Sequence, residues 1–428
     1  MKKSALNFLL VFLPLRLLAN ARFPQPQFDS GHIVPQAHHP PFTTIIPAWA
    51  DVLFLIGALM ITVWLVRKLR SRYTLLAFSF ICLVWFGFIR QGCLCPIGAI
   101  QNIAVTACHG GGLPWHAAAL FALPLLTAIL FGRIFCATTC PLGALQDLFI
   151  IKPLHVPRPL DAVLRLIPLI VLSLGIVYAI NGAGYLICRT DPFVGFFRRS
   201  APISMLIIGT AILFLGMLVA RPYCRYFCPY GVLLELCALK PWKPVALTMS
   251  TCINCHLCVN TCPVDAIARP RPALNDHIRL KQFKRFLMLL ALTPFLILGG
   301  SAAGWFSGAF FAQSHPEVYL LKLVNTIPAE AEDLHPELEV LKNSQRSYEQ
   351  VQTRAAQIIH DFKKDCAWAG LFIGTIIALR LLGLLRLQSR DLHEVNSSRC
   401  IACGRCFAAC PKNHPSITPT SDHKIKNC

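Results

Sequence analysis

The sequence predicts an all-α, polytopic membrane helix bundle that carries a smaller α+β module. Three observations predict this fold class. Of the 428 residues, 55% are hydrophobic and 14% are charged, with a mean hydropathy of +0.57, which is the composition of a membrane protein. Several apolar runs approach the roughly 20 residues that cross a bilayer. Many of the 20 cysteines recur at short, fixed spacings before proline, as they do in metal-cluster motifs.

Two N-terminal segments precede the bundle. Residues 1–21 hold two lysines, an apolar stretch and a small-residue site, which is the pattern of a signal peptide. Pro14 and Arg16 are atypical of such a peptide, so a cleaved signal and an uncleaved anchor both stay open. Residues 22–47, rich in Pro and His, are expected to form an external tail.

Seven apolar segments after this tail have the length and composition of transmembrane helices. The first five belong to a membrane domain, residues 48–240, that also carries Cys-Pro motifs. The sixth and seventh spans are residues 286–311 and 367–385. The five spans of the membrane domain are residues 48–66, 74–89, 115–131, 164–181 and 201–220.

The loop charges predict the orientation. Four basic residues within 67–72 follow the first span and place that loop in the cytoplasm. Alternation then puts residues 221–285 inside and residues 312–366 outside. The inner segment has ten Lys or Arg against three acids, and the outer segment has six against nine, so charge and alternation agree. The net charge of +20 therefore indicates a bacterial inner (cytoplasmic) membrane protein rather than a nucleic-acid partner.

The external segment 312–366 is expected to be helical, because apolar residues recur at helical spacing over 348–359. It is either a solvated connector between two spans or a docking module.

Two cysteine runs, one in residues 241–285 and one in residues 386–428, have the spacing C-x2-C-x2-C-x3-C-P of bacterial ferredoxins. In two-cluster ferredoxins, the first three cysteines of a run bind one [4Fe–4S] cluster and the fourth binds the other. The sequence therefore predicts a cytoplasmic, two-cluster ferredoxin-like (α+β) module. One cluster is expected on Cys252, Cys255, Cys258 and Cys410, and the other on Cys400, Cys403, Cys406 and Cys262.

Two other interpretations of these runs compete with this one. Residues 252–256 also spell C-x-x-C-H, the attachment signal of haem c, and four thiolates can bind zinc. The longer ferredoxin spacing and the cytoplasmic face disfavour haem c. The closing Cys-Pro and the duplication favour iron–sulfur clusters over zinc.

A third motif, C-x3-C-P-x-G preceded by arginine, occurs twice at the cytoplasmic mouths of spans. Its cysteines together supply four thiolates, the number that a third [4Fe–4S] cluster needs. A spacing of one helical turn can also be incidental, so both interpretations stay open. The residues are Cys136 and Cys140 in one copy, and Cys224 and Cys228 in the other.

Cys93, Cys95 and Cys188 lie outside by alternation. They form either a further metal centre near the outer surface or a disulfide, which an oxidising exterior permits.

In the C-x3-C-P pairs and the two ferredoxin runs, the chain resembles the NosR/NapH-like membrane polyferredoxin family, over roughly residues 48–280 and 386–412. The resemblance implies a transfer of electrons between cytoplasmic or quinone-pool donors and a periplasmic redox partner. NosR-like members carry an external flavin-binding domain, for which residues 22–47 are too few, so any flavin would belong to a partner protein.

The resemblance implies an electron-transfer component rather than a stand-alone catalyst, and the sequence predicts no catalytic residues. Two alternatives stay open. One is a quinol-oxidising subunit of a reductase system, which would reduce a quinone analogue. The other is a redox sensor or cluster-assembly factor, which would lose or exchange its clusters.

Overall fold

The computed structural model describes residues 47–90, 96–110, 112–151, 154–198, 202–245, 255–270, 276–326, 348–385 and 393–411. The segment 1–21 and nearly all of the tail 22–47 lie outside these residues. The chain divides into two compact units. The larger holds residues 44–305 and 365–428, and the smaller includes residues 306–364.

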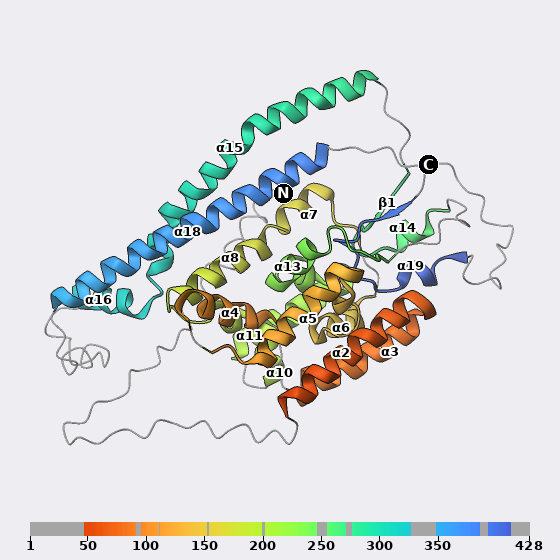
Figure 1. The fold of residues 1–428 in the computed structure, drawn as a ribbon, viewed down its shortest axis with the longest axis horizontal. Helices are drawn as coiled ribbons and strands as arrows, with labels where there is room; N and C mark the ends of the chain where they lie inside the picture. The colour runs from red at the N-terminus through yellow and green to blue at the C-terminus, as the bar shows by residue number, and fades with distance from the viewer. Residues whose placement is uncertain are drawn as a thin grey trace. The chain divides into compact units, whose positions relative to one another are not determined.

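Five helical stretches are long and apolar enough to cross a membrane. They coincide with the segments that the sequence predicts as spans at 48–66, 74–89, 164–181, 286–311 and 367–385. Two of the stretches continue from an α-helix into a π-helix, and a third consists of two helices in succession. The helices are α2 (Ala48–Trp64) with η2 (Leu65–Leu69), α3 (Arg72–Cys82) with η3 (Leu83–Ile89), α7 (Arg158–Leu164) with α8 (Ile167–Ile180), α15 (Asp276–Ala312) and α18 (Tyr348–Leu385). Figure 1 labels α2, α3, α7, α8, α15 and α18.

The other two predicted spans are helical but different in form. Residues 115–131 form α5 (Trp115–Phe131), which has 17 residues and contains Pro124. The segment 201–220 contains α11 (Ile203–Leu218), which meets α10 (Pro192–Arg198) at an angle of 111°. This pair is therefore a broken span or a re-entrant segment rather than one straight crossing.

Between the spans lie three further helices that begin at the proline of a Cys-Pro pair. They are α4 (Pro96–His109), α6 (Pro141–Phe149) and α13 (Pro229–Cys237). Proline suits the first turn of a helix because its missing N–H would have no helical partner there. At 1.5 Å per residue, the nine residues of α6 or α13 reach about 14 Å, roughly half of a bilayer's hydrocarbon core.

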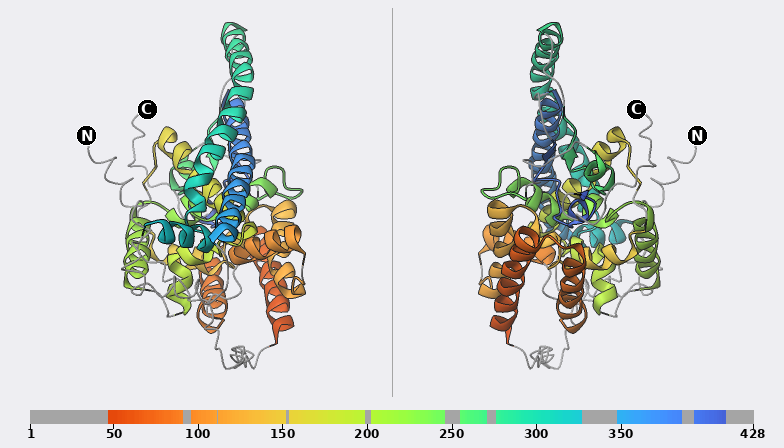
Figure 2. Two further views of the ribbon diagram at one scale, coloured as in Figure 1. Left: turned by 90° about the vertical axis from the view of Figure 1, so that its left-hand side faces the viewer. Right: turned by 90° about the vertical axis from the view of Figure 1, so that its right-hand side faces the viewer.

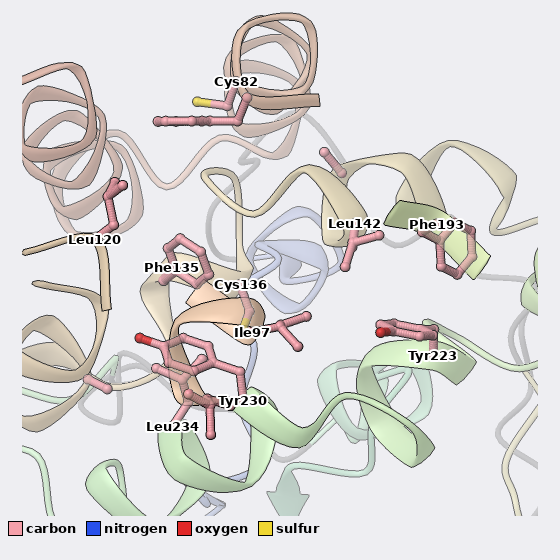
Figure 3. Packing of buried hydrophobic residues seen from close by; sticks show 14 of the residues in the cluster. Cys82, Ile97, Leu120, Phe135, Cys136, Leu142, Phe193, Tyr223, Tyr230 and Leu234 are labelled. Carbon is pink, nitrogen blue, oxygen red and sulfur yellow. The ribbon is translucent and has the colours of Figure 1, made fainter. Parts of the chain in front are cut away.

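All three helices pack inside the bundle. Helix α4 packs against α5 and α8, α13 packs against the same two helices, and α6 packs against α3 and α11. Their side chains share one hydrophobic core with the spans. Figure 3 shows Cys136 in this core among Ile97 of α4, Phe135 and Tyr230 of α13. The Cys-Pro segments are therefore part of the core of the bundle.

Helices α15 and α18 run side by side (Figures 1 and 2), with glycines at their contact. A Cβ atom at Gly370 would lie 2.1 Å from the carbonyl oxygen of Gly300, and one at Gly304 would lie 2.0 Å from that of Cys366. Small residues allow this close backbone approach. Helix α18 runs unbroken from 348 to 385, so no helix end separates the predicted external segment from the seventh span. Within the smaller unit, α16 (Pro316–Thr326) is also helical.

The two ferredoxin-type regions meet in a small sheet. Strands β1 (Ile267–Ala268) and β2 (Glu394–Val395) pair antiparallel, with Ile267 opposite Val395. Beside them, α14 (Leu257–Thr261) packs against α19 (Arg405–Ala408). Segments on either side of the α15–α18 pair in the sequence thus come together, as the cluster exchange between the two runs requires.

Candidate metal centres

The structure brings the four C-x3-C-P cysteines together. Cys136 ends a short 3-10 helix (η4, Ile134–Cys136) and Cys140 caps α6. Cys224 lies in the short helix α12 (Pro222–Tyr226) and Cys228 caps α13. The charge on Cys228 interacts with those on the other three. All four line one cavity.

The duplicated sequence explains this geometry. Each motif places its first cysteine one turn before the proline, and the proline starts a helix that carries the second cysteine at its N-cap. Gly143 and Gly231, two residues after the prolines, lie against the backbone of their own motif: a Cβ atom would be 3.0 Å from the carbonyl oxygen of Cys136 at Gly143 and 3.3 Å from that of Cys224 at Gly231. An arginine of the opposite motif lies next to each glycine. A Cβ atom at Gly143 would lie 3.2 Å from a guanidinium nitrogen of Arg221, and one at Gly231 would lie 3.5 Å from that of Arg133.

Burial of the four-cysteine site opposes ionisation of its thiols until a metal binds. Burial raises the pKa of Cys224 to about 11 and that of Cys228 well above its ordinary value. A bound metal must therefore displace these protons, as thiolate ligation always requires. Gln146 Nε2 donates to Cys224 Sγ over 3.2 Å and would stabilise the thiolate. The hydroxyl of Thr139, which also lines the cavity, is buried without a partner among the described residues.

The ferredoxin-type cysteines form a second group. Cys400, Cys403 and Cys406 pack with Cys262 and Cys258 in one small core. The charge on Cys406 interacts with those of all four others. The amide of Ala266 donates to Cys262 Sγ over 3.3 Å. Cys262 and Cys258 of the first run therefore both lie near the three cysteines of the other run, and the exchange of the fourth ligand stays a prediction.

The two runs also share a backbone turn. His256 and Gly404, each two residues before the third cysteine of its run, adopt left-handed conformations with φ of 57° and 74°. Each caps the short helix that carries that cysteine. The common turn supports the same role for both runs.

The remaining ferredoxin-type cysteines do not form a complete ligand group in the described residues. Cys255 is exposed and Cys410 is partly buried, and Cys252 lies outside the described residues. The predicted set of Cys252, Cys255, Cys258 and Cys410 therefore stays a prediction. No three His, Cys, Asp or Glu side chains in the described part of the chain are spaced to hold a single metal ion.

Of the outer cysteines, Cys188 is described, and Cys93 and Cys95 lie outside the described residues. Cys188, in α9 (Leu186–Thr190), lies against the first turn of α4: its Sγ would be 3.2 Å from a Cβ atom at Gly98. Three residues later, Asp191 accepts a hydrogen bond of 2.6 Å from the hydroxyl of Tyr223.

This arrangement differs from the sequence expectation, which separates Cys188 and Cys224 by the membrane thickness. Tyr223 is the neighbour of Cys224, and residues of α4 and α10 line the same cavity as the four cysteines. The reason is that α4, α6 and α13 all lie inside the bundle, and that α6 and α13 are only half as long as a full crossing. Residues that alternation assigns to opposite faces can therefore meet within it.

Arginines and acids around the four cysteines were not predicted as site residues. Arg221 makes a bidentate ion pair with Asp147, with nitrogen–oxygen distances of 2.9 and 2.7 Å. The signal was present in the sequence, because an arginine precedes each C-x3-C-P motif by three residues. Only the structure shows which residues of the other motif each arginine contacts.

The comparisons with known proteins agree with these sites. A 4Fe-4S binding domain model matches residues 113–154 and 201–243, and a second 4Fe-4S binding domain model matches residues 246–268 and 393–413. The uncharacterized protein MJ0750 of Methanocaldococcus jannaschii is 31% identical over 190 residues, which are 42% of this chain and 77% of that protein.

The chain belongs to the family of MJ0750. Two further relatives are more distant. YccM of Escherichia coli (strain K12), whose name points to electron transport, is 28% identical over 119 residues, 25% of this chain and 33% of YccM. One component of the Na(+)-translocating ferredoxin:NAD(+) oxidoreductase complex of Acetobacterium woodii is 28% identical over 90 residues, 21% of this chain and 27% of that component. No solved structure matches the chain.

These matches confirm that the protein binds [4Fe–4S] clusters, and that it is an iron–sulfur protein of electron transfer. Its several apolar helices are consistent with a membrane protein. The narrower resemblance to the NosR/NapH-like family is not confirmed by them.

Proposed function

We propose that the protein relays single electrons between two ferredoxin-type clusters and a third [4Fe–4S] cluster inside the helix bundle. The observation that carries the proposal is the convergence of Cys136, Cys140, Cys224 and Cys228 on one cavity in the bundle core. A bound [4Fe–4S] cluster supplies reversible one-electron chemistry, and its cysteines fix where the electron resides.

The ligand sets follow the neighbour relations in the structure. Cys400, Cys403, Cys406 and Cys262 hold one ferredoxin-type cluster, and Cys252, Cys255, Cys258 and Cys410 hold the other. The four C-x3-C-P cysteines hold the third. Cys93, Cys95 and Cys188 are candidates for a further centre or a disulfide.

The cluster on the Cys400 run is the one next to the bundle. Arg72, at the start of α3, donates to the carbonyl of Cys403 over 2.9 Å, and Gly404 lies against Leu75 of the same helix. The charge of Arg221, at the four-cysteine site, interacts with both Cys224 and Cys403. The relay therefore runs from the Cys252 cluster through the Cys400 cluster to the four-cysteine centre, or in reverse.

The partners are proposed from the loop charges and the resemblance to the NosR/NapH-like family. The ferredoxin-type module faces the cytoplasm of a bacterium with an inner membrane. Electrons enter from a cytoplasmic donor or the quinone pool and leave to a periplasmic redox partner, with any flavin on a separate protein. The electron-transport name of YccM and the oxidoreductase name of the Acetobacterium woodii relative support the general role.

A quinol-oxidising subunit is the second candidate, and one observation favours it. The cavity at the four cysteines extends along apolar side chains of the spans, including Leu55, Phe86 and Leu120. Reduction of a quinone analogue by the purified protein would favour this candidate over a simple relay.

The test of the proposed function is a count of iron and acid-labile sulfide per chain, with electron paramagnetic resonance during a redox titration. At four irons per cluster, about twelve irons support three clusters and about eight support only the two ferredoxin-type clusters. Zinc in place of iron would refute the proposal. Slow loss or exchange of clusters, without rapid reversible reduction, would indicate a sensor or assembly factor.

A further inference from the structure

We infer that Arg133 tunes the four-cysteine centre and connects it to the Cys400 run, whereas its counterpart Arg221 holds the two C-x3-C-P segments together. The inference rests on the proposed function, because it assumes a cluster on the four cysteines. Neither arginine is a ligand. Both act through the cysteines and backbone groups that they contact, so they are positioning residues.

The two arginines hold equivalent places in the duplicated motif, each three residues before its first cysteine. Each reaches across to the opposite copy. Arg221 lies over Gly143 of the first motif and pairs with Asp147. Arg133 lies over Gly231 of the second motif, and its charge interacts with that of Glu235. Asp147 and Glu235 are themselves equivalent, each seven residues after its motif's second cysteine, so the exchange is reciprocal.

The partners of Arg221 show a structural role. Its guanidinium donates to both carboxylate oxygens of Asp147, and also to the backbone carbonyls of Cys136 and, at 3.3 Å, Ala137. Its side chain is 1% exposed. These bonds tie the N-terminal end of one motif to the backbone of the other, so Arg221 acts as a clasp between the halves of the four-cysteine site.

The partners of Arg133 are different. Its Nη2 lies 4.0 Å from Cys136 Sγ, and its Nη1 donates over 3.3 Å to the carbonyl of Ser398, two residues before Cys400. Its Nε has no hydrogen-bond partner among the described residues, although the residue is 7% exposed. Arg133 therefore has spare donor capacity beside a cysteine sulfur, and one side chain links the two cysteine groups.

Arg133 belongs to a group of arginines that line a second cavity. This cavity lies beside the four-cysteine site and is lined by Cys224 and Cys228 and by Val264 and Ile401 of the ferredoxin-type module. Six arginines line it, with Glu235 as the one acidic residue in its lining. The arginines are Arg133, Arg165, Arg221, Arg225, Arg380 and Arg399.

Clusters bound on the two sides of this cavity would carry negative charge on their thiolates, which the arginine layer would offset. When one electron moves between the two centres, one is oxidised and the other is reduced, and no bond forms or breaks. A fixed positive charge close to a sulfur ligand favours the reduced, more negative state. Because Arg133 is buried and its Nη2 lies 4.0 Å from Cys136 Sγ, its charge should act directly on the reduction potential.

The test uses the full chain in detergent, with potentiometric titration followed by electron paramagnetic resonance, and iron and sulfide counts. Cys140→Ser identifies the signal of the four-cysteine centre. Arg133→Gln should keep the iron and sulfide content and disfavour reduction of that centre about tenfold, a shift of 59 mV to lower potential for a one-electron couple. Arg133→Lys, which keeps the charge, should shift it much less.

Two control variants separate tuning from structure. Arg380→Gln removes a charge from the same cavity, but that side chain is 33% exposed and its only contact with the second motif among the described residues is a long ion pair of 4.0 Å with Glu235, so its shift should be small. Arg221→Gln should lose about a third of the iron, because the clasp opens.

The outcomes are distinct. If Cys140→Ser removes no signal from the spectrum, the third cluster of the proposed function is absent. If that signal exists but Arg133→Gln shifts it no more than Arg380→Gln does, the inference on Arg133 is wrong while the proposed function stands. Loss of iron in Arg133→Gln would also overturn the inference, because Arg133 would then build the site rather than tune it.

Discussion

Replacing Asp147 with Asn should destabilise the bundle, because Asp147 is the counter-ion of the buried Arg221. Asp147 is 7% exposed and its side chain accepts two hydrogen bonds from Arg221, of 2.9 and 2.7 Å. Asparagine has nearly the same shape but no charge, and its amide group can accept at only one of the two positions. Arg221 would then be left buried without its counter-ion.

The magnitude follows from the burial of both partners. Removal of one partner from a buried ion pair costs about 3–5 kcal/mol, because the other charge is left without compensation. Burial opposes ionisation of Asp147, but the Arg221 guanidinium outweighs it and holds the pKa of Asp147 below its ordinary value. A lowered pKa in the folded state stabilises the protein at neutral pH. That stabilisation is lost as the pH falls through the folded pKa, so the difference between wild type and variant should shrink in acid.

The assay is the free energy of unfolding of the purified chain in mixed micelles titrated with denaturing detergent. Asp265→Asn is a matched control with the same chemical change. The side chains of its ion pair with His155 are 36% and 50% exposed, and asparagine tolerates its left-handed backbone (φ 50°). Asp265 also lies 3.8 Å from the buried Arg225, which keeps its closer ion pair of 2.7 Å with Asp161 in the variant. The control should therefore change stability by less than about 1 kcal/mol. If Asp147→Asn costs no more than this control, the clasp does not stabilise the bundle.

Four further predictions test other features. Cys410→Ala should perturb the cluster held by Cys252, Cys255 and Cys258; a change confined to the Cys400 cluster would show that the runs do not exchange ligands. Tyr223→Phe should lower the free energy of unfolding by about 1–3 kcal/mol, since Asp191 loses its 2.6 Å hydrogen bond while buried; an unchanged value would contradict the contact. Gly370→Val should destabilise the α15–α18 pair by about 1–3 kcal/mol or more, whereas Gly383→Val, at a position with open space, should be tolerated; equal effects would refute the packing argument. An impermeant thiol reagent on intact cells, after reduction and cluster removal, should label Cys93, Cys95 or Cys188 and spare Cys252 and Cys400; labelling of Cys252 from outside would reverse the topology.

Most of what could be predicted from the sequence came from two patterns: the hydropathy, which indicates the spans, and the cysteine spacing, which indicates the clusters. The apolar runs located the spans because a full crossing needs a long, uninterrupted apolar segment, as in α2 and α8. The C-x2-C-x2-C-x3-C-P runs predicted the partners Cys262 and Cys400 far apart in the chain, because ligand exchange between the runs follows from their duplication. The small sheet of β1 and β2 agrees with that expectation.

The half-length helices could not be predicted in the same way. Nine-residue helices such as α6 and α13 are too short for a hydropathy window, so they read as loops. For this reason the sequence placed Cys188 and Cys224 on opposite faces, although Tyr223 and Asp191 join their segments. The exchange of Arg133 and Arg221 also depends on tertiary structure, since a motif does not show which copy its arginine contacts.

The pairing of the two ferredoxin-type regions has a consequence for biosynthesis. His256 and His393, whose ring nitrogens lie 2.9 Å apart, are separated by 137 positions in the chain. At a synthesis rate of about 5–20 residues per second, the ribosome needs on the order of ten seconds to make the chain between them. During that time α15 and α18 must enter the bilayer, while the cysteines of the first run wait without their partners. Delivery of iron and sulfide should therefore follow membrane insertion, and a nascent chain stalled before residue 393 should remain without its ferredoxin-type clusters.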